Sequence, residues 1–64
     1  MTAASLIAEA IKLAKSGETK LRFATNDMRN TPFADEYLRE SSDELQTAAK
    51  CIDAARQQLS RDAS

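Results

Sequence analysis

The sequence predicts an all-α protein: an antiparallel helical hairpin with alternating small and large heptad layers, expected to dimerise into a four-helix bundle. Two observations support this prediction, a seven-residue repeat and a strong turn signal near the middle of the chain. Small residues recur at Ala3, Ala10, Gly17 and Ala24, and again at Ala34, Ser41, Ala48 and Ala55. Mostly larger residues interleave with them at Ile7, Ala14, Leu21 and Met28, and then at Leu38, Leu45, Ile52 and Leu59.

The two halves of the repeat match when the chain folds back near Thr31. Each residue then meets a partner whose number brings the sum to 62, and seven of the eight resulting layers place a large residue against a small one. None of these positions is charged, although charged residues make up 30% of the chain. The pattern therefore predicts two helices that pack antiparallel at close approach.

The first helix is expected from Thr2, as its N-cap, to about Arg29. Gly17 is its weak point, because glycine in a helix interior costs about 1 kcal/mol relative to alanine. Two interpretations are open. Gly17 ends a short helix, as glycine often does, or it lies in a continuous helix because Leu45 needs the space opposite. The repeat continues in phase after Gly17, which favours the continuous helix.

The turn is expected at residues 30–31, and the second helix from about Pro32 to Arg61. Asn30 tolerates the left-handed conformation that ends helices, Thr31 is a good cap, and Pro32 suits a first helical turn. Asp35 and Glu36 follow, near the helix N-terminus that favours negative charge. Residues 1–64 then form a single domain.

The small size of the chain points to self-association. Sixty-four residues are near the lower limit for independent folding, and one hairpin leaves much of its apolar surface in water. Cys51 is the only cysteine, so no disulfide forms within one chain. A homodimer is therefore predicted, and its contacts are expected near the termini, where the apolar surface is widest. The candidate dimer residues are Leu6, Leu13 and Cys51 on one flank of the repeat and Ile11 and Ala49 on the other.

Composition argues against an enzyme, a metal site and a bound cofactor. The chain has no histidine, one cysteine and no glycine-rich phosphate loop. The carboxylates at 35, 36, 40, 43 and 44 are interpreted as a solvated face, with a carboxylate metal site as the alternative. Cys51 is expected to pack beside Leu13, with a dimer-linking or reactive thiol as its alternative. The lack of a signal peptide or membrane-spanning segment predicts a cytoplasmic protein.

The main surface feature is a row of basic residues, here called the basic stripe, formed by Lys15, Arg22 and Arg29. Residues 1–30 carry a net charge of +2 and residues 32–64 a net charge of −3. One interpretation is a solvated helix face with an ion pair from Glu18 to Arg22. The other is a docking face for an acidic protein surface or a nucleic acid, anchored by Phe23. The candidate partner-binding residues are Lys15, Arg22, Phe23, Asn26 and Arg29.

The aromatic residues Phe23, Phe33 and Tyr37 lie near the predicted turn. Structural packing is the first interpretation of Phe33 and Tyr37. An aromatic end formed by all three residues is the alternative, and it would suit a partner.

This layout resembles the Rop family of plasmid copy-number regulators. The resemblance rests on chain length, a midpoint turn and alternating core layers, and it implies a dimeric four-helix bundle and RNA binding by the first helices. No motif beyond the heptad matches, so no functional residue is carried over. Three functions remain open. The first is a small regulatory or inhibitory protein that binds another protein, as phage, plasmid and bacterial accessory factors often do; the others are an RNA-binding hairpin and a structural or assembly subunit.

Overall fold

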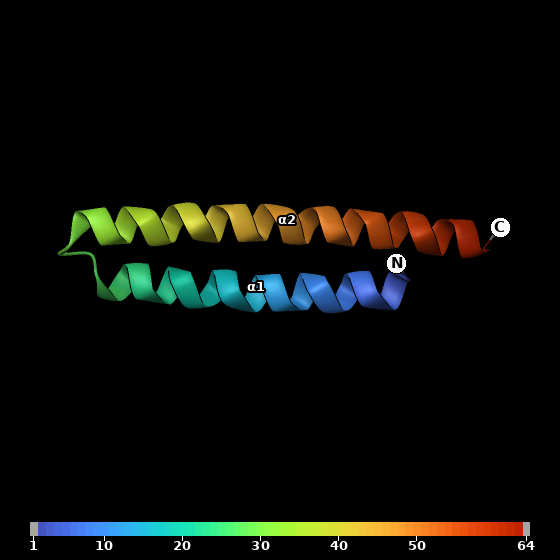
Figure 1. Ribbon diagram of the computed structural model, residues 1–64, viewed down its shortest axis with the longest axis horizontal. Helices are drawn as coiled ribbons and strands as arrows, with labels where there is room; N and C mark the ends of the chain where they lie inside the picture. The colour runs from blue at the N-terminus through green and yellow to red at the C-terminus, as the bar shows by residue number, and fades with distance from the viewer. Residues whose placement is uncertain (1, 64) are drawn as a thin grey trace.

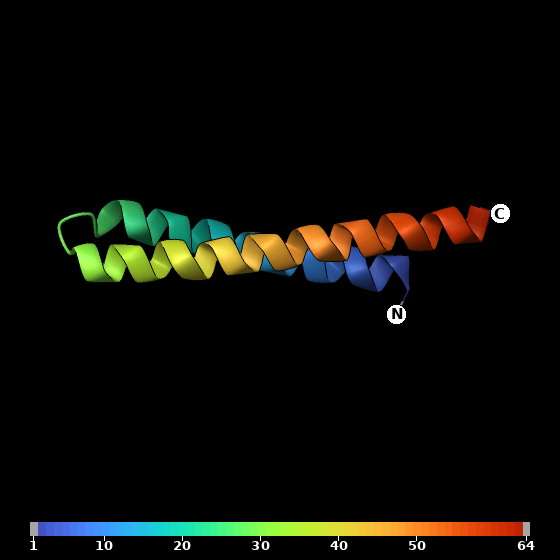
Figure 2. The ribbon, with the colours of Figure 1, turned by 90° about the horizontal axis from the view of Figure 1, so that it is seen from above.

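The computed structural model consists of two antiparallel helices, α1 (Ala3–Asn26) and α2 (Thr31–Ala63), and describes residues 2–63. The helices run side by side along a rod of 52 × 13 × 13 Å, and two views at right angles show the same pairing (Figures 1 and 2). The predicted all-α hairpin is confirmed. Within the described residues, neither helix is long and apolar enough to cross a membrane.

The start and the middle of α1 follow the sequence prediction. The side chain of Thr2 caps the helix, because its Oγ1 accepts a hydrogen bond from the backbone N–H of Ser5 at 3.1 Å. The helix then runs unbroken through Gly17. A Cβ atom placed on Gly17 would lie 3.0 Å from Cγ of Leu45, so the glycine makes room for that leucine. The interpretation of a continuous helix is confirmed.

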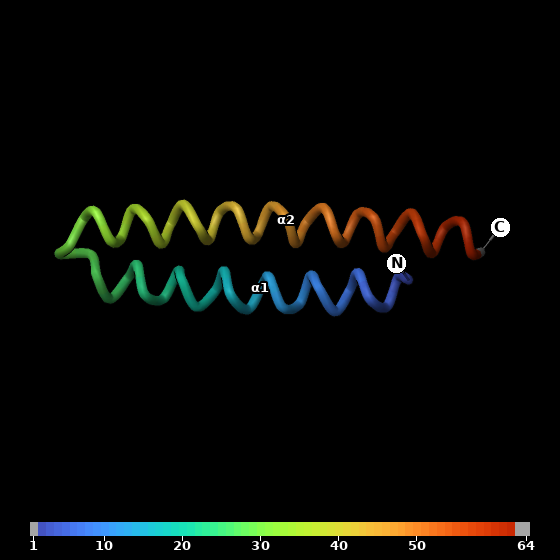
Figure 3. Tube along the Cα trace, viewed as in Figure 1, coloured from blue at the N-terminus to red at the C-terminus, as the bar shows by residue number. Residues whose placement is uncertain are grey.

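The turn differs from the prediction in its position and conformation. α1 ends at Asn26 rather than Arg29, because the Asp27 N–H closes the last helical turn on the Phe23 carbonyl at 2.9 Å and the chain then leaves the helix. The Asn30 N–H donates to the Asp27 carbonyl at 2.8 Å and tightens the connection seen in Figure 3. No residue of the described chain has a positive φ, so the expectation of a left-handed backbone conformation at Asn30 is wrong.

The second helix begins one residue earlier than predicted and ends later. The Asn30 carbonyl accepts from the N–H of Ala34 at 3.0 Å, so Thr31 already lies within α2 instead of capping it from outside. Asp35 and Glu36 fall after the first turn, which contains no acidic residue.

The buried core consists almost entirely of small residues. We call this row the small-residue seam, and its buried members are Ala10, Gly17, Ala24, Ala34, Ser41, Ala48 and Ala55. Ser41 is the most deeply buried, with 1% of its surface exposed, and its Oγ donates to the Gly17 carbonyl of the other helix at 3.0 Å. Small side chains thus let the two backbones approach closely.

The large residues of the repeat are not enclosed between the helices. Ile7, Leu21, Leu38, Leu45, Ile52 and Leu59 are each between 39% and 54% exposed. Leu45 lies against Gly17, so this one of the predicted small–large layers is confirmed. The small residues of the repeat are therefore buried, whereas its large residues remain partly in solvent.

Candidate protein-binding surfaces

One side of the hairpin is an open apolar face. Because successive helical residues are 100° apart, the large members of the repeat lie to one side of the small-residue seam on both helices. The face is made of exposed residues from both helices, namely Ile7, Ile11, Ala14, Leu21, Leu38, Leu45, Ala49, Ile52 and Leu59. Charged residues border this row, because Glu18 and Arg56 lie one heptad after Ile11 and Ala49.

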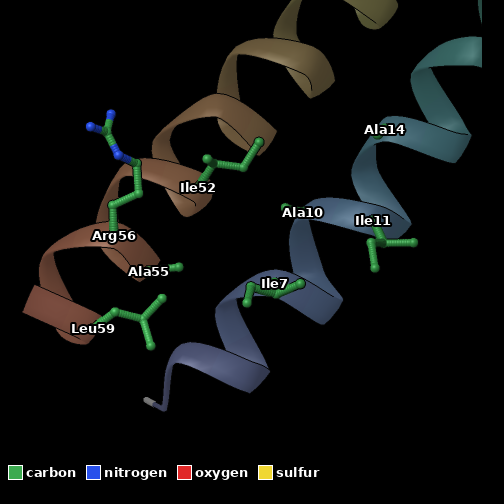
Figure 4. Close-up of a pocket in the computed structure, with 8 residues that line it drawn as sticks. All are labelled: Ile7, Ala10, Ile11, Ala14, Ile52, Ala55, Arg56 and Leu59. Carbon is green, nitrogen blue, oxygen red and sulfur yellow. The ribbon is translucent and has the colours of Figure 1, made fainter. Parts of the chain in front are cut away.

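The terminal half of this face is hollowed into a groove of about 370 Å³. Ile7 and Ile11 of α1 border it on one side, and Ile52 and Leu59 of α2 on the other (Figure 4). The lining is almost wholly apolar; the side chain of Arg56 supplies the charge at its rim. The groove is therefore an apolar hollow on the surface of the single chain.

The opposite side, here called the closed flank, is held together by contacts between the helices. The ammonium group of Lys20 on α1 is paired with the Glu44 carboxylate on α2, as the sequence predicted, and lies 3.9 Å from Glu40. The hydrogen bond from Lys20 lowers the pKa of Glu44, with a further contribution from Ser16. The same hydrogen bond raises the pKa of Lys20. These half-buried groups fix the register of the two helices.

An aromatic pair extends the closed flank toward the turn. The rings of Phe23 and Tyr37 lie with centroids 5.5 Å apart and planes inclined by 51°, a favourable tilted geometry. Phe23 remains 46% exposed and Phe33 55% exposed, whereas Tyr37 is half-buried. Phe23 thus packs against Tyr37, a contact that the sequence analysis did not predict. Its distance from Tyr37 follows from the register, because residue numbers summing to about 60 face each other on this flank.

The predicted partner-binding residues are exposed but do not form one straight row. Lys15 and Arg22 lie on the outer surface of α1, and the Arg22 guanidinium pairs with Glu18 at 2.7 Å, as predicted. Asn26 is the last residue of α1, and Arg29 lies beyond it in the turn. The helical part of the basic stripe therefore consists of Lys15 and Arg22.

The predicted dimer residues divide between the two sides of the hairpin. Leu6, Leu13 and Cys51 are half-buried on the closed flank, and Cys51 is a free thiol. Ile11 and Ala49 are exposed on the open apolar face. The five residues therefore do not make one surface, and only the last two lie where the hairpin leaves a broad apolar area uncovered.

The carboxylates at 35, 36, 40 and 43 are exposed as predicted, but Glu44 is half-buried in its pair with Lys20 and does not belong to a solvated face. Asp35 pairs with Arg39 at 3.2 Å, and both side chains are largely exposed. Among the residues that the structure describes, no group of three or more Asp, Glu, Cys or His side chains gathers as a metal site. Comparison of the chain with protein-family models, with curated proteins and with solved structures finds no match.

Proposed function

We propose that this protein is a small non-enzymatic regulatory or inhibitory factor that acts by binding another protein, with a homodimeric four-helix bundle as its scaffold. Accessory factors of phage, plasmid or bacterial origin fit this description. The observation that carries the proposal is the arrangement of its surfaces on opposite sides. The open apolar face lies on one side, and the exposed ring of Phe23 lies beside the basic stripe on the other.

The arrangement lets one chain make two kinds of contact at once. Phe23 follows Leu21 by two positions, and each position turns the helix by about 100°. The two side chains therefore point about 160° apart. A subunit packed on the open apolar face therefore leaves Phe23 and the basic stripe free for a partner. An aromatic side chain flanked by arginine is the composition typical of binding hot spots.

The experiment that tests this function compares variants with matched charge changes on the two helices. Lys15→Glu with Arg22→Glu reverses the basic stripe on α1, and Lys50→Glu with Arg61→Glu makes the same change in charge on exposed positions of α2. We expect affinity capture from a cell extract to lose its bound protein with the first variant and to retain it with the second. Equal retention by both variants would place the site elsewhere.

Phe23→Ala is a second variant for the same experiment. It also removes the ring contact with Tyr37, which is worth about 0.5–1.5 kcal/mol beyond area burial. Its capture result is therefore compared with that of Tyr37→Ala, which loses the same ring contact but leaves Phe23 in place. We expect Phe23→Ala to lose the partner and Tyr37→Ala to keep it at temperatures where both remain folded.

RNA is the alternative partner, favoured by the exposure of Lys15 and Arg22 and by the doubling of the stripe in a dimer. The net charge of −1 is unfavourable for it, because nucleic-acid binders usually carry a basic excess. Retention of structured RNA with a steep dependence on salt concentration would favour this alternative. Loss of that RNA with Lys15→Glu and Arg22→Glu would place it on the same surface.

A further inference from the structure

We propose that the open apolar face is the surface on which a second copy of this chain packs, with its turn at the opposite end of the bundle. The inference deepens the proposed function, because it names the face and the orientation of the dimer on which that function rests. It also separates the face from the closed flank, where Leu6, Leu13 and Cys51 lie.

The first argument is the area that the hairpin leaves uncovered. The chain exposes 4891 Å². A compact monomer of 7.0 kDa exposes about 4,040 Å² according to the scaling of surface with mass. The excess of about 850 Å² matches the roughly 800 Å² that each partner buries in a standard protein–protein interface.

The second argument is the chemistry of the face. It presents large aliphatic side chains from both helices, and a seam of Ala and Gly lies beneath them. In a four-helix bundle, such side chains form the central layers between two helix pairs. Soluble monomers rarely leave a continuous apolar patch of this extent in water. Charged residues are confined to its rims, including Glu18 on α1 and Arg56 on α2.

The third argument selects a second copy and its orientation. The terminal half of the face contains the groove between Ile7 and Ile52, whereas its turn half presents the leucines at 21, 38 and 45. A two-fold axis across the middle of the hairpin places the leucines of each copy over the groove of the other. Such a self-complementary contact closes after two subunits. The leucines and the groove that form this contact are both present in one chain.

The test begins with the mass of the wild-type protein in solution. We expect light scattering at micromolar concentration to give about twice the 7.0 kDa chain mass, and the melting temperature to rise with protein concentration because association stabilises the fold. A folded chain of single mass, whose melting temperature is independent of concentration, would overturn the proposal.

Two variants test which face is used. Ile11→Glu and Ala49→Glu place a carboxylate on the open apolar face, at positions that are exposed in the isolated hairpin. The controls Ala8→Glu and Thr47→Glu make similar changes at exposed positions outside this face. We expect the first pair to raise the dimer dissociation constant by roughly 100-fold or more, since the dimer would bury an unpaired charge.

A variant that fails to fold also gives a clear answer. Ile11 is 51% exposed in one hairpin, so unfolding of Ile11→Glu but not of Ala8→Glu shows that the position is covered in the native assembly. Unchanged mass and stability in both face variants would overturn the assignment. Partner capture is scored separately: loss of the partner with an intact dimer disproves only the function assigned to the basic stripe.

Orientation is measured with a spin label at Asn30→Cys in a Cys51→Ser background. Turns at opposite ends of the bundle give a separation between labels close to the 52 Å length of the hairpin. A separation below half that length would overturn the proposed orientation.

Discussion

The two sides of the hairpin differ in how they are completed. On the closed flank, side chains of both helices meet: Lys20 pairs with Glu44, and Phe23 packs against Tyr37. On the open apolar face, the large residues of each helix remain 39–54% exposed. One chain thus supplies contacts between its own helices on the closed flank and leaves the large residues of its apolar face partly in solvent.

This difference separates two kinds of contact within a chain of 64 residues. Polar and aromatic contacts on the closed flank set register within the hairpin, because their geometry is specific. Aliphatic contacts on the open apolar face are not directional, so burial of these side chains is favourable against any apolar surface. The small-residue seam lies between the closed flank and the open apolar face, so a change in the seam affects the packing of both.

Replacing a residue of the small-residue seam with a larger one should lower the free energy of unfolding most, because the change disturbs both sides of the hairpin. Ala24 is 2% exposed, and Ala24→Leu forces the helices apart at a cost of about 1–3 kcal/mol. The matched control is Gln57→Leu, which adds a leucine at an exposed position of α2. Urea unfolding at equal protein concentration measures both. Equal destabilisation by the two leucines would show that the seam does not set the distance between the helices.

Removing the hydroxyl of Ser41 should cost less. Its buried hydrogen bond to the Gly17 carbonyl joins the two helices. Ser41→Ala keeps the small volume and loses only this bond, with an expected cost of about 0.5–1.5 kcal/mol. Ser42→Ala is the control, because Ser42 is exposed and bonds to Gln46 within its own helix. A Ser42→Ala effect as large as that of Ser41→Ala would contradict the interpretation.

Much of the fold was predictable because its signals are local or periodic. The capping side chain of Thr2, the continuity at Gly17 and the Lys20–Glu44 pair all follow from residue type and heptad register. The end of α1 was not predictable in the same way. Met28 continues the repeat by one step, yet backbone hydrogen bonds at Asp27 and Asn30 have already turned the chain.

The candidate site was less predictable than the fold. A stripe of small residues with larger ones three or four positions away fits two interpretations, since neighbours on either side of the stripe repeat with the same period. Ile7 and Leu6 flank Ala3 and Ala10 equally well in the sequence. Only the packed helices show that the flank of Leu6 is the closed one and that Ile7 lies exposed on the open apolar face.

Gly17→Ala tests the contact between the small-residue seam and Leu45 of the open apolar face. Alanine raises helix propensity by about 1 kcal/mol relative to glycine, but its Cβ would lie 3.0 Å from Cγ of Leu45 and 3.2 Å from Cδ2. We therefore expect a gain well below about 1 kcal/mol in the wild type. In a Leu45→Ala background the contact is absent, and alanine should stabilise by close to the full amount.

The difference between the two backgrounds is the quantity to measure, since it isolates the contact between the two side chains. It should reach at least about 0.5 kcal/mol in urea unfolding at matched dimer fraction. Equal effects of Gly17→Ala in both backgrounds would mean that Leu45 moves aside freely.

The smallest expected effect is the pH dependence of the closed flank, where Lys20 and Glu44 remain partly exposed and their pairing is weakened by solvent. The lowered pKa of Glu44 stabilises the fold above its ordinary value of 4.5, and this contribution is lost as pH falls through the folded-state pKa. The raised pKa of Lys20 acts in the opposite direction. Its contribution is present below 10.5 and is lost as pH rises through the higher folded-state pKa.

The urea midpoint of Glu44→Gln should therefore lie below that of the wild type by a constant amount between these two ordinary pKa values, and the gap should narrow in acid below 4.5. Glu18→Gln serves as the control, because it removes the exposed pair with Arg22 on a single helix and should leave the midpoint nearly unchanged. A gap for Glu44→Gln that persists undiminished in strong acid would mean that the carboxylate acts by packing rather than by charge. In that case Glu44 would contribute to the closed flank through its shape.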